Sequence, residues 1–318
     1  MRARLIANPT SGTDRALDLL PLIADRLRTR FADLDVTVTS GPADASRAAA
    51  SAVTEQCSAL YVAGGDGTLN AALRGLFERT DSPRLSVGII PLGTGNDFAK
   101  ALDLGEDAEA ALDVLMNPSV VTVDIGMMND RPFVNTSAGG FIADVSDAVT
   151  PAMKDAAGKL AYLIGGARAL ITTEPLRMRL LVSPAGGSAS MPAGESVVQM
   201  FAVCNARFIG GGYAIAPGAV IDDGLLDALV VPEMSFLEFI AMLQRIASAG
   251  DPGRDDVLHF RSSAFDLEFD REARVNVDGE VLAARRCRYR VRQEGVPFFC
   301  GPRPHSVRPP RRYQFDER

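Results

Sequence analysis

The chain has 318 residues, of which 47% are apolar and 23% charged, and this is the composition of an ordinary globular protein. Its length favours two domains over a single core, and its net charge of −7 argues against nucleic acid as the main partner. No apolar run reaches about 18 residues, so no segment is predicted to span a membrane.

Strand and helix patterns alternate over the first 125 residues. The predicted strands are 4–7, 36–39, 59–63 and 85–90, and the predicted helices are 14–31, 43–56 and 69–77. Pro21 lies inside the first of these helices and predicts a kink there. Alternation with short loops predicts a parallel sheet covered by helices, and therefore an α/β nucleotide domain.

After about residue 120 the pattern becomes rich in strands. The predicted strands are 120–124, 132–136, 176–182, 197–204, 226–231, 264–269, 274–277 and 287–291. Two helices are predicted, at 153–170 and 236–249, and a loop at 184–195. This half is predicted to be a mostly antiparallel, β-sandwich-like domain.

The predicted strand 59–63 runs into Gly64-Gly65-Asp66-Gly67, and a helix pattern follows at once. Glycine lets the backbone approach an anion closely, and a helix N-terminus offers unpaired N–H groups to phosphate. Asp66 would repel phosphate unless it binds a cation or accepts a proton. The turn therefore predicts metal-assisted phosphoryl transfer.

Two further turns of this kind follow predicted strands, at residues 8–12 and 91–99. One such turn is weak evidence, since many are simple tight turns. Parallel strands place their carboxyl ends at one edge of the sheet, where ligands bind in open α/β folds. Three glycine-rich turns at strand ends therefore indicate a ligand site.

The motifs together resemble the diacylglycerol kinase catalytic family, which includes bacterial lipid kinases and the sphingosine and ceramide kinases. The family is distantly similar to NAD kinases and phosphofructokinases. The motifs that carry the resemblance are 8–12, 64–70, 91–97, 135–141, 158–162, 210–212, 216–227 and 278–280. Their order and spacing cover nearly the whole chain.

The resemblance implies an ATP site at the three turns. Thr39 is included because Asp44-Ala45 follows it. Only three of the 33 basic residues are lysines, so backbone N–H groups, Mg²⁺ and arginine must balance the phosphate charge. Neither a P-loop nor a protein-kinase motif is present. The implied contacts are Asn8, Pro9, Thr10, Ser11, Gly12, Thr39, Gly64, Gly65, Asp66, Gly67, Thr68, Leu69, Asn70, Gly93, Thr94, Gly95 and Asn96.

Asp278-Gly279-Glu280 is, on its residues alone, a hairpin turn. The resemblance instead implies a catalytic turn in which Glu280 accepts the proton of the lipid hydroxyl. Asp66 is the alternative base. We assign the base to Glu280 and the organisation of metal or phosphate to Asp66, with Asp278 as the third catalytic residue.

A second turn, Asp222-Asp223-Gly224-Leu225, also has the composition of a loop. The resemblance implies a structural Mg²⁺ here, bound by Asp223 and by the carbonyls of Val220 and Leu225. Few protein ligands, completed by water, are typical of Mg²⁺.

Arg286, Arg288, Arg290 and Arg292 alternate with other residues, so a strand would place all four on one face. A solvated sheet face is one interpretation. The other is a docking face for an anionic membrane surface, to which each basic residue contributes about 1 kcal/mol of binding free energy.

The sequence thus predicts a nucleotide domain at 1–125 and a lipid-binding domain at 126–300. By the resemblance, 301–318 returns to the first domain. We expect ATP-dependent phosphorylation of a diacylglycerol-type or ceramide/sphingoid-type lipid. A soluble-metabolite kinase of the NAD kinase type is the alternative, and Asp66 and Glu280 argue against a non-catalytic nucleotide-binding regulator.

Four scattered cysteines and the lack of a leader pattern predict the cytoplasm. Contact with its lipid substrate then requires peripheral association with the inner membrane surface. The oligomeric state is open, with a homodimer as one option.

Overall fold

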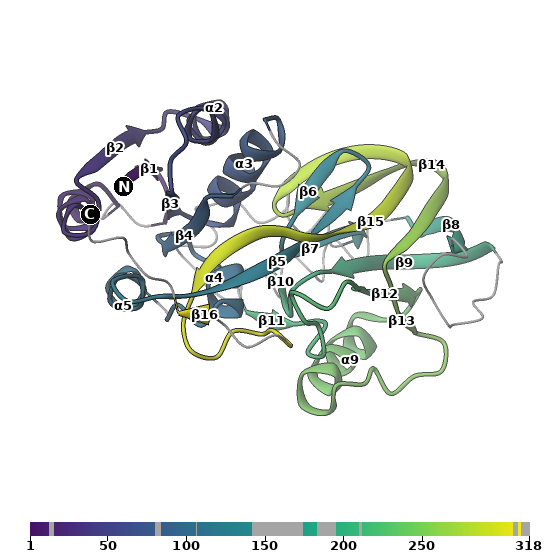
Figure 1. The fold of residues 1–318 in the computed structure, drawn as a ribbon. Helices are drawn as coiled ribbons and strands as arrows, with labels where there is room; N and C mark the ends of the chain where they lie inside the picture. Colours follow the sequence, from purple (N-terminus) through teal and green to yellow (C-terminus); the bar gives the residue numbers. More distant parts are fainter. Residues whose placement is uncertain are drawn as a thin grey trace.

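The computed structural model describes residues 1–12, 16–79, 84–105, 107–141, 174–182, 195–209, 212–307 and 311–312. Its first part is a parallel sheet with helices on both faces (Figure 1). The elements are β1 (Arg2–Ala7), α1 (Ala16–Arg28), β2 (Asp33–Val38), α2 (Pro42–Thr54), β3 (Ala59–Gly64), α3 (Asp66–Phe77), β4 (Ser86–Pro91), α4 (Asp97–Ala101) and α5 (Ala108–Leu115).

The parallel strands lie in the order β4-β3-β1-β2, and α2 and α3 cover the face opposite α5 (Figure 1). Every residue of β3 and β4 is buried. That is why both strands are continuous apolar runs rather than alternating patterns, since a parallel sheet is covered on both faces.

The second part is antiparallel, as predicted. Its strands are β5 (Ser119–Met128), β6 (Arg131–Phe133), β7 (Thr136–Gly140), β8 (Leu176–Val182), β9 (Glu195–Cys204), β10 (Phe208–Ile209), β11 (Tyr213–Ala214), β12 (Leu226–Pro232), β13 (Leu258–Ser262), β14 (Ala264–Val277), β15 (Glu280–Cys300) and β16 (Arg311–Arg312). Helix α9 (Phe236–Ala249) packs on it. The predicted fold class, a parallel α/β part followed by an antiparallel β-rich part, is confirmed.

Strand β15 joins the two parts into one continuous sheet (Figure 1). Near its start it pairs with β14, and near its end Phe298 pairs with Val87 of β4. Phe298 and Phe299 are fully buried in the core of the first part. Strand β5 also runs across the boundary predicted at residue 125. The two parts therefore share strands and do not meet at a flexible linker.

The segment after β15 lies against the first part. Gly301 N–H donates to the carbonyl of Leu102, and His305 N–H donates to that of Ala101, both at 2.8–2.9 Å. Strand β16 pairs with β5.

Several elements differ from the prediction. The expected strands 264–269 and 274–277 form one strand, β14, whose register shifts between Glu268 and Ala273. The expected strand 132–136 is divided into β6 and β7. The short helix α4 follows the glycine-rich turn at 91–99, which was expected to lead into a helix, whereas α5 was not predicted. Pro21 lies within α1. The predicted helix 153–170 and nearly all of the predicted loop 184–195 fall outside the described residues.

No helix in the described ranges is long and apolar enough to cross a membrane. This agrees with the expectation that no segment spans one.

Helices α2 and α3 pack so closely that Gly75 admits no side chain. A Cβ atom there would lie 1.9 Å from the carbonyl oxygen of Ser46. We expect Gly75→Ala to lower the free energy of unfolding by about 1–3 kcal/mol, because the two helices must separate. Gly67→Ala is the matched control on the same helix, since nothing lies within 4 Å of its Cβ position. Urea unfolding measures both, and an equal effect of the two variants would contradict this packing argument.

Candidate functional site

Three glycine-rich loops meet at the carboxyl edge of the parallel sheet. They follow β1, β3 and β4, the adjacent parallel strands. A Cβ atom on Gly12, whose φ is +73°, would lie 2.0 Å from the Leu92 carbonyl oxygen. A Cβ on Gly93 would lie 2.6 Å from the Cα of Gly65. The loops touch through their backbones, so glycine is required by this contact as well as by any ligand.

Side chains of the first loop connect it to α3. Asn8 Nδ2 donates to Thr68 Oγ1 at 3.0 Å, and Asn8 Oδ1 accepts from Thr10 N–H at 3.1 Å. Gly65 N–H donates to Ser11 Oγ at 3.3 Å. The loops are therefore fixed relative to the N-terminus of α3, where backbone N–H groups favour an anion.

Asp66 stands in the first turn of α3 and connects both parts of the chain. Its carboxylate accepts N–H from Asp97 at 3.2 Å and from Phe98 at 3.4 Å, and Asn135 Nδ2 donates to it at 3.1 Å. Loss of hydration raises the pKa of Asp66, and the nearby charge of Asp97 raises it further, while these three donors oppose the shift.

Asp278 organises the second part at the same place. With φ at +45°, it begins the turn between β14 and β15. Its buried carboxylate accepts backbone N–H from Val134 at 2.7 Å, Asn135 at 3.1 Å and Thr136 at 2.9 Å. Burial raises the pKa of Asp278 to about 7, and the charge of Asp66 adds to the shift. The binding of these N–H groups explains why the strand predicted at 132–136 is divided.

Glu280 lies two residues further, at the start of β15. Its Oε2 accepts from Arg74 Nη1 of α3 at 2.5 Å, and its Oε1 lies 3.8 Å from Arg131 Nη1. Of the Glu280 side chain 38% is exposed, so the carboxylate faces solvent in part. The structure thus brings a carboxylate from β15 to the helix that bears the phosphate turn.

Not every residue predicted to contact the nucleotide turns its side chain toward the loops. Leu69 is buried in the core. Asn70 Nδ2 donates to the Pro132 carbonyl at 2.8 Å. Thr39 is buried, and its N–H donates to the Ala7 carbonyl at 2.8 Å. Thr94 is exposed. Of these four, Thr94 alone has an open side chain, whereas the side chains of Leu69, Asn70 and Thr39 are buried.

The remaining predicted contacts lie in the loops themselves. Asn96 has φ at +51°, and its side chain spans Gly93, accepting from its N–H at 2.9 Å and donating to its carbonyl at 2.6 Å. The Gly95 carbonyl accepts from Lys100 Nζ at 2.9 Å. Pro9 is partly exposed, and Gly67 is exposed.

Four residues of this neighbourhood were missed by the sequence reasoning: Arg74, Asp97, Arg131 and Asn135. Asp97 lies within the glycine-rich turn at 91–99, and Asn135 opens one of the family motifs, so motif position could have indicated both. Arg74 lies four residues after Asn70, on the same face of α3. Arg131 carried no signal in the sequence. The motif residues 158–162 and 210–211 lie outside the described residues.

The turn at Asp223 is separate from this cluster. Asp223 Oδ1 accepts from Leu225 N–H at 3.1 Å, and its other oxygen is paired with the Arg261 guanidinium. Arg261 Nε also donates to Asp227 at 3.2 Å. In the described part of the chain, His, Cys, Asp and Glu form no group of three suited to a metal ion.

The four alternating arginines of β15 lie on one face, but two of them form ion pairs within the protein. Arg286 Nη2 and Arg290 Nη1 contact the two oxygens of Asp266 at 2.7 and 2.8 Å. Burial would raise the pKa of Asp266, but hydrogen bonds from these two arginines outweigh it and lower that pKa. Arg292 lies 4.8 Å from the centre of the Phe77 ring.

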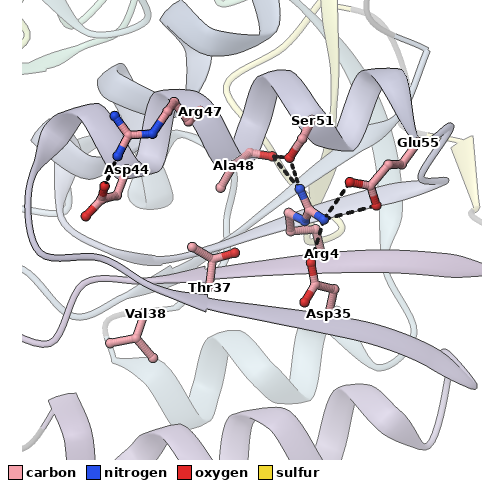
Figure 2. Close-up of a pocket in the computed structure, with 9 residues that line it drawn as sticks. All are labelled: Arg4, Asp35, Thr37, Val38, Asp44, Arg47, Ala48, Ser51 and Glu55. Atoms are coloured by element: carbon pink, nitrogen blue, oxygen red, sulfur yellow. Dashed lines mark hydrogen bonds and ion pairs between the residues drawn. The ribbon is translucent and has the colours of Figure 1, made fainter.

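A hollow of about 540 Å³ opens elsewhere, between β2 and α2 (Figure 2). Arg4 and Arg47 line it, but Arg4 is bonded to Asp35 and Glu55, and Arg47 to Asp44. With three carboxylates against two engaged arginines, it offers no charge for phosphate.

The chain matches two protein-family models, one in each of its two parts. A family model described as diacylglycerol kinase catalytic domain matches residues 2–128. A second, described as YegS C-terminal NAD kinase beta sandwich-like domain, matches residues 136–299.

Curated relatives include a diacylglycerol kinase of Staphylococcus saprophyticus, 31% identical over 88% of this chain and 88% of the relative. Another, from Staphylococcus aureus strain MRSA252, is 32% identical over 88% and 86%. Among solved structures, a diacylglycerol kinase from Bacillus anthracis strain Sterne has a TM-score of 0.77 at 24% identity. The match covers 95% of this chain and 97% of that one, and it supports the fold.

The raised pKa of Asp278 predicts a pH dependence of stability. An acid that binds its proton more tightly when folded stabilises the protein below its unfolded pKa of 3.8 and loses that contribution as pH rises toward about 7. Asp278→Asn cannot titrate, so the Tm of wild type relative to that of the variant should fall as pH rises from 4 to about 7. Calorimetry without nucleotide or Mg²⁺ measures it, and a constant difference would contradict the argument.

Proposed function

The chain belongs to the diacylglycerol kinase family and is a lipid kinase, and from this premise we propose that ATP is its phosphoryl donor. The acceptor we propose is the hydroxyl of a membrane lipid of the diacylglycerol or the ceramide/sphingoid class. The N-terminal part binds ATP with Mg²⁺, and the β-rich part binds the lipid. In this proposal residues 1–125, with 301–318 returning to them, form the ATP-binding part, and residues 126–300 form the lipid-binding part.

One observation carries the proposal. The glycine loops of the first part and the Asp278 turn of the second meet at Asp66, through the hydrogen bond from Asn135. Glu280, a carboxylate of the lipid-binding part, is bonded to Arg74 on the same helix whose N-terminus would hold the phosphate. Phosphoryl transfer depends mainly on such positioning and on charge.

In the proposed reaction Glu280 accepts the proton of the lipid hydroxyl as its oxygen attacks the γ-phosphorus of ATP. The bond from this phosphorus to the bridging oxygen breaks, and ADP leaves with the electron pair. Mg²⁺ bound with ATP supplies positive charge to the phosphates. Asp66 would be suited to that cation, because burial and the neighbouring charge of Asp97 raise the pKa of its carboxyl and a cation would offset both. Asp278 positions the turn that bears Glu280.

The NAD kinase-like description of the second domain model favours one alternative, a kinase of soluble nucleotides. We keep it as an arm of the assay. For a lipid substrate we propose a cytoplasmic protein that reaches the inner membrane surface peripherally. Since Asp266 pairs with Arg286 and Arg290, the β15 face contributes less attraction to anionic lipid than four free arginines would.

We also propose a structural Mg²⁺ at Asp223, with the carbonyls of Val220 and Leu225. The Asp223 side chain is 14% exposed and attracts a cation, here the Arg261 guanidinium. Because Arg261 also donates to Asp227, it can leave Asp223 without losing every partner. The turn can therefore exchange one cation for another.

The function is tested with radiolabelled ATP, Mg²⁺ and a panel of diacylglycerol, ceramide, sphingosine, phosphatidylglycerol and NAD. We expect label in one lipid class and none in NAD. Asp66→Asn keeps the volume of the side chain but removes its charge, so kcat should fall at least about tenfold while the protein stays folded. Label in NAD alone would refute the lipid proposal, and an active Asp66→Asn variant would remove Asp66 from the mechanism.

The metal proposal predicts opposite responses to Mg²⁺. A cation bound only by the folded state raises Tm by mass action. Asp223→Ala should weaken the rise in Tm with Mg²⁺. Arg261→Gln removes the competing cation, so its Tm should begin to rise at lower Mg²⁺ concentrations than that of wild type. Thermal melts over a Mg²⁺ series measure both, and identical curves for both variants and wild type would mean that this turn binds no metal.

A further inference from the structure

One face of helix α3 is turned toward the second part of the chain. Asn70, Arg74 and Phe77 follow the i, i+4, i+7 spacing of a helix face. Asn70 donates to the Pro132 carbonyl, Arg74 to Glu280, and Phe77 lies beneath Arg292. The helix that bears the phosphate turn at its N-terminus is therefore joined by Arg74 to the carboxylate that we propose as the base.

Arg74 is the better placed of the two cations beside Glu280. Its Nη1 is 2.5 Å from Glu280, against 3.8 Å for Arg131, and 23% of its side chain is exposed, against 43%. Arg131 is thus an exposed ion pair, of a kind that contributes little. The nearby lysine, Lys100, is held by Gly95 and Asp97.

The position of the base limits how far Arg74 can be from the reaction. A base acts at about 2.6–3.2 Å from the hydroxyl oxygen, and that oxygen attacks phosphorus from about 3–3.5 Å. A guanidinium bonded to the base is therefore within about 10 Å of the transferred phosphoryl oxygens, and rotation of the long arginine side chain can bring it into contact with them. Side chains on a helix also lean toward its N-terminus, which here is the phosphate turn.

The guanidinium has five N–H donors in a rigid fork, and one contact with Glu280 leaves others available. A base carboxylate and a γ-phosphoryl group are both anions, so their approach requires a cation between them. Lysine offers a point charge without the fork and cannot reproduce this geometry.

We propose that Arg74 is a catalytic residue that bridges Glu280 and the transferred phosphoryl group. The proposal rests on the proposed function, since it takes Glu280 as the base. While the lipid oxygen forms its bond to phosphorus and its proton passes to Glu280, Arg74 donates to the phosphoryl oxygens and neutralises the charge carried to the transition state.

A double-mutant cycle tests the bridge, with kcat for lipid phosphorylation measured in wild type, Arg74→Gln, Glu280→Gln and the double variant. Loss of one transition-state donor costs about 10²–10³ in kcat, and we expect this for Arg74→Gln. The double variant should be at least tenfold slower than Glu280→Gln, because contact with the phosphoryl group does not need Glu280. Equal rates for these two would reduce Arg74 to a positioning residue and overturn the proposal.

Arg292→Gln is the matched control, assayed with a short-chain, water-soluble lipid so that membrane attraction plays no part, because it alters the same helix face next to Phe77 but not the site. We expect its kcat to stay within about twofold of wild type. A similar loss of kcat in both variants would mean that each substitution acts by disturbing the contact between α3 and the second part, and this would overturn the proposal. A raised Kd for MgATP with unchanged kcat in Arg74→Gln would also overturn a transition-state role.

Chemical rescue covers the case in which Arg74→Gln does not fold well. Arg74→Ala leaves space for a free guanidinium ion, and millimolar guanidinium should raise its kcat at least fivefold, but not that of Asp66→Asn. No rescue of a folded Arg74→Ala protein would count against the proposal. If the wild type labels no lipid, the proposed function fails; if it labels lipid and only the cycle fails, the role of Arg74 alone is refuted.

Discussion

The three hydrogen bonds that Asp278 accepts from consecutive backbone N–H groups are the interaction on which the site depends. They hold Asn135 in place, and Asn135 in turn donates to Asp66. The carboxylate of the β14–β15 turn is thereby coupled to the phosphate turn of a different part of the chain. Without it, the loop between β6 and β7 would leave three buried N–H groups unsatisfied, at a cost of about 1–3 kcal/mol each.

The site gathers negative charge before any substrate arrives. Asp66, Asp97 and Asp278 are close enough for Asp97 to raise the pKa of Asp66, and Asp66 that of Asp278. Uncharged N–H groups donate to Asp66 and Asp278, while Lys100 Nζ pairs with Asp97 at 3.3 Å. An incoming phosphate must therefore bring its own cation, and this agrees with a metal-dependent kinase. Arginine supplies the other positive charge at the edge of the site, at Glu280.

Strand β15 connects the candidate site to the core of the first part. It begins at Glu280 and ends with Phe298 and Phe299 in the core beneath the nucleotide loops. It pairs with β14 from Glu280 to Arg290 and with β5 from Tyr289 to Cys300, so the same strand carries the proposed base and enters the first part.

The sequence alone determined the features that depend on neighbouring residues. The bounds of α9 were predicted from its pattern, and the Ser235–Glu238 capping box and Gly250 at its end are local signals. The glycine turns at the ends of β1, β3 and β4 were likewise readable, because their composition reflects backbone geometry. So were the α/β class and the change to antiparallel strands.

Only the tertiary structure decided which residues meet. Arg74 and Glu280 are 206 positions apart, and no periodic pattern joins them. Leu69, implied as a nucleotide contact, has its side chain in the core, and two of the four β15 arginines are paired with Asp266. Pairing and burial depend on how strands distant in sequence are registered against one another. That register is set by packing of the whole chain, so the charge and reach of each side chain at the site follow from the fold and not from its motif.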